Sequence, residues 1–233
     1  MSESFPLDRI LDSGIIAIVR LDSADGLLRV AEALLAGGID VIEFTMTTPD
    51  ALDVIRAATS EFGDDMVIGA GTVLDPETAR AAILAGARFV VTPTLRRGTI
   101  ELCRRYGAPI CVGAYTPTEI LSAWEWGADL VKVFPATSLG PGYLRDIHAP
   151  LPHVRLVPTG GVTLDNVGAF VEAGAAAVAV GSSLVGRALV AAGDWASLTV
   201  HAAAFTGVIR MARDRQSGLQ PPARVGNPSQ SDR

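Results

Sequence analysis

Lysine is nearly absent from this sequence: only one of its 19 lysine and arginine residues is a lysine. That residue, Lys132, lies in the apolar run Leu130–Pro135 and not in a polar segment. Arginine remains charged at any accessible pH, whereas an amine among aliphatic side chains has its neutral form favoured and can attack a carbonyl carbon. Lys132 is therefore a candidate Schiff-base nucleophile. The alternative is that biased codon usage removed the other lysines and that Lys132 reaches for solvent from a strand edge.

Cysteine is also scarce. Cys103 and Cys111 are the two cysteines, and they do not form a Cys-x-x-Cys motif. The first residues, Met1–Asp8, lack the basic start and the apolar core of a signal peptide, so we expect a cytoplasmic protein with reduced thiols. Both cysteines are interpreted as small buried hydrophobic side chains.

Long apolar runs, basic charge and histidine are limited in ways that exclude several partners. Although 49% of the residues are hydrophobic, no uninterrupted apolar stretch reaches the roughly 18 residues of a membrane span, so no membrane partner is expected. A net charge of −6 without a basic stripe argues against nucleic acid. His148 and His153 share one connection instead of meeting at strand ends, so no metal site is expected.

Short apolar runs rich in β-branched residues recur along the chain, and each predicts a strand. Continuous apolar strands of this kind are buried on both faces, as parallel strands covered by helices are. The eight predicted strands lie within Gly14–Arg20, Asp40–Thr45, Met66–Thr72, Arg88–Pro93, Pro109–Ala114, Leu130–Pro135, Val154–Gly160 and Ala177–Gly181.

Helices with clear start and stop signals separate these runs. Asp75 followed by Pro76 predicts a capped helix through Thr78–Leu84, and Thr116 followed by Pro117 does the same for Ile120–Trp126. Glycine takes a left-handed cap readily, so four further helix ends are predicted at Gly37-Gly38, Gly86, Gly127 and Gly174.

Eight successive strand–helix units predict an α/β fold, a (β/α)₈ TIM barrel that closes near residue 190. We expect one barrel domain over residues 1–215 that includes a C-terminal helix, Trp195–Arg213. Residues 216–233 are rich in Pro, Gly, Ser and Gln and predict a disordered tail. An open doubly wound sheet is the alternative fold, but Gly69-Ala70-Gly71 lacks the third glycine of a dinucleotide-binding loop.

Active sites of such barrels lie at the carboxyl ends of the strands. Glu43 would be costly to bury there unless it is paired or used, which favours a functional role. The threonines have an alternative role, because their hydroxyls could simply satisfy backbone groups. The polar and small residues at the predicted strand ends are Arg20, Glu43, Thr72, Thr92, Pro93, Lys132, Thr159, Gly160, Gly161, Gly181 and Ser182.

Glycine turns follow the last two predicted strands. Gly160-Gly161 and Gly181-Ser182 lie where barrel enzymes often bind phosphate, because glycine lets backbone N–H groups approach an oxyanion. The pair predicts a phosphate site, although glycine turns are also common as simple connectors.

Four segments resemble the class I aldolases for 2-keto-3-deoxy-6-phosphogluconate and 4-hydroxy-2-oxoglutarate. Gly127–Ala136 resembles the Schiff-base lysine segment of that family, with Val133 where leucine or phenylalanine is usual. Gly38–Thr45 resembles the segment of the catalytic glutamate, and Ile68–Leu74 and Pro158–Val162 match further family blocks. The resemblance covers nearly the whole barrel. It implies cleavage of a 2-keto-4-hydroxy acid to pyruvate and an aldehyde, by a homotrimer.

The chain departs from the family pattern at positions that would line the site. Many members end the glutamate segment with an arginine that holds the substrate carboxylate, and Thr47 stands there in this chain. Some relatives instead carry an arginine at the end of the first strand, as Arg20 does here. The motif after strand four reads Thr92-Pro93-Thr94 in place of Ser-Pro-Gly or Ser-Pro-His, and the Pro-Gly of strand five reads Val112-Gly113.

The chemistry of the residues agrees with this resemblance. Lys132 would form an imine with the C2 ketone, and Glu43 would move the protons, so no metal or other cofactor is required. Arg20 and Thr72 would hold the carboxylate of the keto-acid substrate. Pro93 and Thr159 would line the site, and the phosphate would rest on Gly160, Gly161, Gly181 and Ser182.

Three other functions fit parts of the sequence. A metal-dependent aldolase would need ligands that the histidines do not provide. An isomerase or epimerase would share the phosphate turns without needing Lys132. A non-catalytic barrel that binds sugar phosphates would need neither Lys132 nor Glu43.

Overall fold

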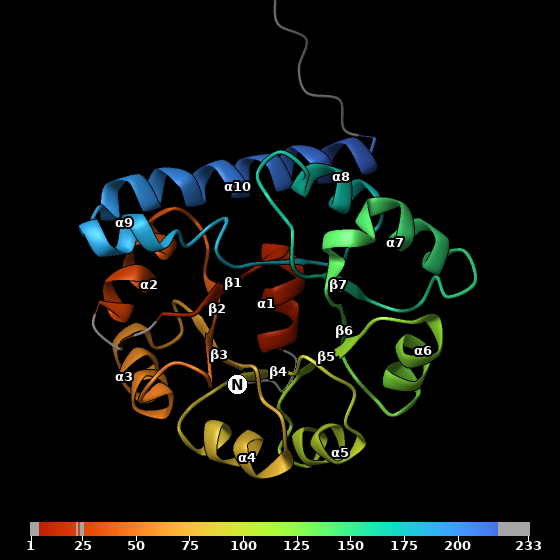
Figure 1. The fold of residues 1–233 in the computed structure, drawn as a ribbon, viewed down its shortest axis with the longest axis horizontal. Coiled ribbons are helices and arrows are strands. Elements are labelled where there is room, and N and C mark those ends of the chain that lie inside the picture. Colours follow the sequence, from red (N-terminus) through yellow and green to blue (C-terminus); the bar gives the residue numbers. More distant parts are fainter. Residues whose placement is uncertain (1–4, 22, 24–25, 219–233) are drawn as a thin grey trace, which may run out of the picture.

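The computed structural model describes residues 5–21, 23 and 26–218, and within them eight parallel strands form a nearly closed barrel (Figure 1). Neighbouring strands pair in the order β7-β6-β5-β4-β3-β2-β1-β8, and an isolated bridge between Thr159 and Ala179 joins β7 to β8. Each strand lies inside one of the predicted apolar runs, so the TIM-barrel prediction is confirmed. The strands are β1 (Ile15–Val19), β2 (Val41–Thr45), β3 (Val67–Gly71), β4 (Phe89–Val91), β5 (Ile110–Ala114), β6 (Leu130–Val133), β7 (Leu156–Pro158) and β8 (Val178–Val180).

Helices surround the barrel (Figure 1). One apolar core lies between the strands and these helices, and a smaller one fills the inside of the barrel. The surrounding helices are α2 (Leu27–Ala36), α3 (Ala51–Phe62), α4 (Pro76–Leu84), α5 (Arg97–Arg105), α6 (Pro117–Glu125), α7 (Gly140–His148), α8 (Val167–Glu172) and α9 (Arg187–Ala192), with a 3₁₀ turn, η1 (Ala136–Ser138), before α7.

The predicted helix signals act as expected. The Asp75 carboxylate accepts a hydrogen bond from the backbone N–H of Thr78 at 2.6 Å, and Thr116 forms a capping box with Glu119. The glycines at four helix ends, Gly38, Gly86, Gly127 and Gly174, have φ values of 84°, 110°, 94° and 97°. Helix ends of this kind turn the chain back into the next strand within two or three residues.

An N-terminal helix, α1 (Phe5–Ser13), was not among the sequence predictions. It lies across the middle of the ring in Figure 1, and its fully buried Ile10 packs into the inner core. The Arg9 guanidinium pairs with Asp40, at the amino end of β2, and donates to the Asp65 carbonyl at 3.2 Å. Helix α1 therefore covers the amino-terminal end of the barrel, the end opposite the predicted site.

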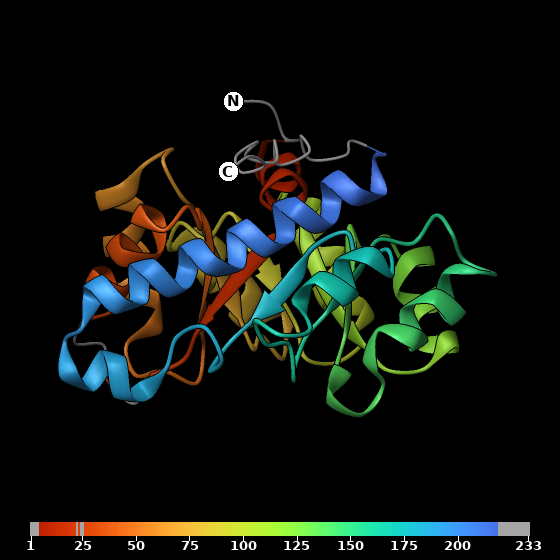
Figure 2. The same ribbon diagram turned by 90° about the horizontal axis from the view of Figure 1, so that it is seen from above.

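The C-terminal helix, α10 (Trp195–Gln216), runs along α2 and α8 (Figure 2). Arg213 anchors its end by donating to the carbonyls of Leu11 at 2.7 Å and Ala176 at 3.2 Å. The helix begins at the predicted residue and ends at Gln216, three residues beyond its predicted end at Arg213. The predicted disorder beyond it falls mainly on residues 219–233, which lie outside the described residues, and the division of domains near residue 215 stays a prediction. In the described part of the chain, no helix has the length and apolarity needed to cross a membrane.

Candidate active site

Strand alternation points Glu43 and Lys132 into the barrel. Their neighbours on either side, Ile42 and Phe44 in β2 and Val131 and Val133 in β6, pack outward into the core under the helices. Side chains on a strand alternate between its two faces, so Glu43 and Lys132 face the interior of the barrel. Only 1% of Glu43 and 5% of Lys132 is exposed.

A cavity of about 500 Å³ opens at this end of the barrel. Its walls contain nine of the ten residues predicted for the site, including Lys132. The tenth, Glu43, does not line the cavity, but its carboxylate is close enough to Lys132 and Arg20 for both charges to lower its pKa. The predicted residues on the wall are Arg20, Thr72, Pro93, Lys132, Thr159, Gly160, Gly161, Gly181 and Ser182.

The Glu43 carboxylate is held without full compensation of its charge. Burial raises its pKa above the ordinary value of 4.5, while the positive charges of Lys132 and Arg20 lower it by a smaller amount. Its Oε2 atom has no hydrogen-bond partner among the described residues. A carboxyl group with a raised pKa and an unused acceptor is suited to accept and return protons.

Lys132 places its amine beside an aromatic ring. Its Nζ lies 5.0 Å from the centroid of the Phe134 ring, and among the described residues the amine has no ion-pair partner. Phe134 also lines the cavity, so an apolar surface flanks the candidate nucleophile. An amine that is not locked in an ion pair remains available to a carbonyl carbon.

Arg20 and Thr72 meet across the top of β2. The Arg20 Nη2 atom donates to the Thr72 hydroxyl at 3.3 Å. Thr72, the residue after β3, has a φ of 58°, which is unusual for a β-branched side chain. Such strained backbone clusters at functional sites, and here it accompanies a hydroxyl that faces the cavity beside a guanidinium.

Glycine has a different structural reason in each of the two turns, the one after β7 and the one after β8. Gly161 has a φ of 72°, and a Cβ there would lie 2.8 Å from the Thr137 Cα, so the fold itself requires glycine. A Cβ at Gly181 would meet only Ile18, at 3.8 Å. The Ser183 hydroxyl donates to the Val162 carbonyl and ties the turns together. Glycine at 181 is therefore not needed for packing and leaves space in the cavity.

Phe134 and Arg187 are among the seven wall residues that the sequence analysis did not predict for the site. Arg187 follows the turn after β8, and with Arg20 and Lys132 it makes three cationic side chains around the cavity. No aspartate or glutamate among the described residues lines it. The signal that could have found Arg187 is its place at the start of the helix that follows a predicted phosphate turn.

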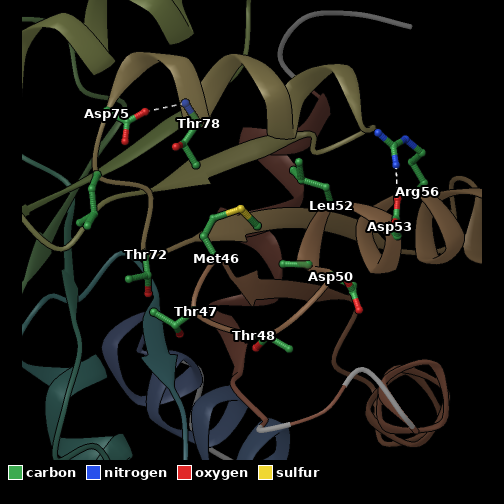
Figure 3. A pocket seen from close by; sticks show the side chains of 12 residues that line it. Met46, Thr47, Thr48, Asp50, Leu52, Asp53, Arg56, Thr72, Asp75 and Thr78 are labelled. Atoms are coloured by element: carbon green, nitrogen blue, oxygen red, sulfur yellow. Dashed lines mark hydrogen bonds and ion pairs between the residues drawn. The ribbon is translucent and has the colours of Figure 1, made fainter.

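A second cavity, of about 580 Å³, lies between the starts of α3 and α4 and shares Thr72 with the first (Figure 3). Three of its four charged side chains are engaged, because Arg56 pairs with Asp53 and Asp75 caps α4; the fourth is Asp50. Thr47, which replaces the arginine of many family members, lines this cavity and not the first one. The amine and the buried carboxylate make the first cavity the candidate active site.

A (β/α)₈ barrel that brings a buried amine and a buried carboxylate together at the carboxyl ends of its strands has the architecture of an aldolase. Comparison with known protein families agrees, because the family model described as "KDPG and KHG aldolase" matches residues 8–201. The chain belongs to this family of carbon–carbon lyases.

Individual relatives support the same assignment. The 2-dehydro-3-deoxy-6-phosphogalactonate aldolase of Escherichia coli K12 is 36% identical over 171 residues, which cover 73% of this chain and 83% of the relative. A 2-dehydro-3-deoxy-phosphogluconate aldolase of Pseudomonas aeruginosa is 36% identical over 188 residues, covering 80% and 85%. The solved KDPG aldolase of Legionella pneumophila, which holds pyruvate as a covalent carbinolamine, has a TM-score of 0.78 and 30% identity, covering 86% of this chain and 97% of that one.

Proposed function

We propose that this protein is a class I aldolase that cleaves a 2-keto-3-deoxy-6-phospho-sugar acid to pyruvate and a phosphorylated aldehyde. The observation that carries this proposal is the placement of the single lysine of the chain. Lys132 is buried on the inner face of β6, lines the cavity, and lies close enough to Glu43 to shift its pKa.

The reaction needs an electron sink at C2 of the substrate. The neutral Lys132 amine adds to the C2 ketone, and loss of water from the carbinolamine gives a protonated imine. Removal of the C4 hydroxyl proton then lets the C3–C4 bonding electrons move toward the imine, which releases the aldehyde and leaves an enamine. Protonation of C3 and addition of water release pyruvate and restore the amine.

Glu43 is the group proposed to move these protons. It supplies the proton for loss of water, accepts the proton of the C4 hydroxyl, and returns one to the enamine carbon. One carboxyl group can serve all three steps because each step leaves it in the protonation state that the next one needs. Its raised pKa supports this use, since a carboxyl group that titrates closer to neutral pH both gives and takes protons more readily.

The carboxylate of the pyruvyl half is assigned to Arg20 and Thr72. The guanidinium and the hydroxyl lie 3.3 Å apart, so one carboxylate can accept hydrogen bonds from both. This arrangement compensates for Thr47, which lines the neighbouring cavity and offers no cation. Pro93 and Phe134 supply apolar wall in the same cavity, and the Phe134 ring lies beside the amine.

The distal end of the substrate is assigned to the turns after β7 and β8. Gly160, Gly161, Gly181 and Ser182 offer backbone N–H groups, and Arg187 adds positive charge at the same end. The cationic side chains of Arg20, Lys132 and Arg187 on the cavity wall favour a ligand with an anionic group at each end. The names of the relatives supply the candidates to be tested, namely the phosphogluconate-derived and phosphogalactonate-derived acids, with 4-hydroxy-2-oxoglutarate as the unphosphorylated alternative.

Borohydride trapping tests the central step directly. With pyruvate present, reduction should attach a pyruvate-derived group to the tryptic fragment that contains Lys132, and the terminal amine is the only other amine in the chain. Lys132→Arg keeps the charge but removes the nucleophile, so trapping and turnover should both be lost while the melting temperature stays near that of the parent. An adduct found only at Met1, or substantial cleavage by the arginine variant, would favour an isomerase or a non-catalytic binding protein instead.

The remaining expectations concern the whole protein. The family resemblance implies a homotrimer, which light scattering on the purified protein would test. A panel of keto acids, coupled to detection of pyruvate, would identify the preferred substrate.

A further inference from the structure

The Glu43 carboxylate occupies the space that a side chain at residue 71 would fill if that residue were not glycine. A Cβ built on Gly71 would be 2.7 Å from Glu43 Cδ, 2.8 Å from Oε1 and 3.0 Å from Oε2. These three carboxylate atoms are the nearest neighbours of that position. A carbon atom normally approaches such atoms no closer than about 3.5 Å, so an alanine at 71 and the present position of the carboxylate exclude each other.

The strand register explains this proximity. Glu43 pairs with Gly69 in the β2–β3 ladder, and Gly71 lies two residues further toward the active-site end. Strand side chains lean along the strand direction, so the long Glu43 side chain crosses β3 at the level of Gly71. This crossing carries the carboxylate up to the level of the strand ends, where Arg20 and Thr72 lie.

The backbone of Gly71 cannot retreat to admit a side chain. Gly71 pairs with Thr45 in the ladder, and its carbonyl accepts a hydrogen bond from the Met46 N–H at 2.8 Å. In addition, φ at Gly71 is not in the left-handed region, so alanine suits the local backbone. The flexible end of Glu43 is therefore the part that would move.

We propose that Gly71 is a positioning residue that holds the Glu43 carboxylate at its working position by the absence of a side chain. The proposal rests on the proposed role of Glu43 in proton transfer. Relieving the overlap requires a displacement approaching 1 Å, and misplacement of a catalytic group by that amount can cost about 100-fold in rate.

The Gly71→Ala variant tests this idea, with Gly207→Ala as the matched control. Gly207 lies in α10, and a Cβ added there would meet no neighbouring atom within 4 Å, so the control should keep parental kinetics. In Gly71→Ala, kcat should fall roughly 10- to 100-fold with a small change in KM, and the melting temperature should stay close to that of the parent. The acid limb of the kcat profile should move to lower pH, because a carboxylate pushed toward the cavity loses part of the burial that raises its pKa.

A double-variant cycle separates positioning from structural damage. Glu43→Gln already lacks proton transfer, so adding Gly71→Ala to it should lower kcat by less than about 3-fold. A full and independent loss in that background would overturn the proposal, as would parental kcat in Gly71→Ala alone. Parental kcat in Glu43→Gln alone would instead show that the proposed role of Glu43 is wrong, whatever Gly71 does.

Discussion

Thr72 stores backbone strain that glycine should release. At a φ of 58° its Cβ crowds the following carbonyl, and such conformations cost about 1–3 kcal/mol. Replacing threonine with glycine removes this strain but frees the unfolded chain, which costs about 0.4–1 kcal/mol. The hydrogen bond lost to Arg20 is long and exposed, so it subtracts about 0.5 kcal/mol at most. The net expectation is a gain of about 1 kcal/mol in the free energy of unfolding.

The melting temperature and the kinetics of two variants, Thr72→Gly and Thr72→Ala, test this prediction. For a chain of this length, a gain of about 1 kcal/mol raises the melting temperature by about 2–4 °C. Thr72→Ala keeps the Cβ and should show no such rise. Both variants lose the hydroxyl assigned to the substrate carboxylate, so both should raise KM for the keto acid by roughly 10-fold or more. Stability gained in one variant and affinity lost in both would separate the strain from the hydroxyl.

A lower or unchanged melting temperature in Thr72→Gly would show that the backbone of Thr72 is not strained. Parental KM in both variants would leave the strain in place but remove Thr72 from the proposed carboxylate site.

Three further predictions concern the acid–base group and the phosphate end. Burial raises the folded-state pKa of Glu43 above 4.5, so the stability linked to its protonated form is present at low pH and is lost as pH rises through the folded-state pKa. Glu43→Gln should therefore have a higher melting temperature than the parent at pH 7, and this difference should disappear in acid. A difference in melting temperature that grows toward low pH would contradict this prediction. Arg187→Gln should raise KM for a phosphorylated substrate roughly 10- to 100-fold and leave deuterium exchange into the methyl group of pyruvate unchanged. The control variant Arg210→Gln, at an exposed residue, should change neither quantity. Gly181→Ala fits the fold, since its Cβ would lie 3.8 Å from Ile18, and should raise KM for the phosphorylated substrate while sparing that exchange; equal effects on both would mean that the turn is only structural.

Local patterns were enough to predict the barrel. Buried parallel strands need near-continuous apolar runs, and helices need caps that can be read over four residues, so the strand segments and the ends at Gly86 and Gly174 follow from short stretches of chain. Helix α1 was not predicted because its apolar residues are covered by the barrel interior, a partner remote in sequence. Helix α10 continues beyond its predicted end because Gln216 is held by the Val171 carbonyl, at 2.8 Å from its side-chain amide.

The candidate nucleophile could be identified from the sequence alone, because a single lysine within an apolar strand is chemically unusual. The sequence also predicted that Glu43, Arg20 and the glycine turns lie at one end of the barrel, because the carboxyl ends of parallel strands are all on the same side. Tertiary structure decided what those residues touch. It brought Arg187 to the cavity, placed Thr47 in the neighbouring one, and set the Glu43 carboxylate against Gly71. These outcomes depend on side-chain directions and on contacts between distant strands, to within about 1 Å, and no local pattern of residues encodes distances of that kind.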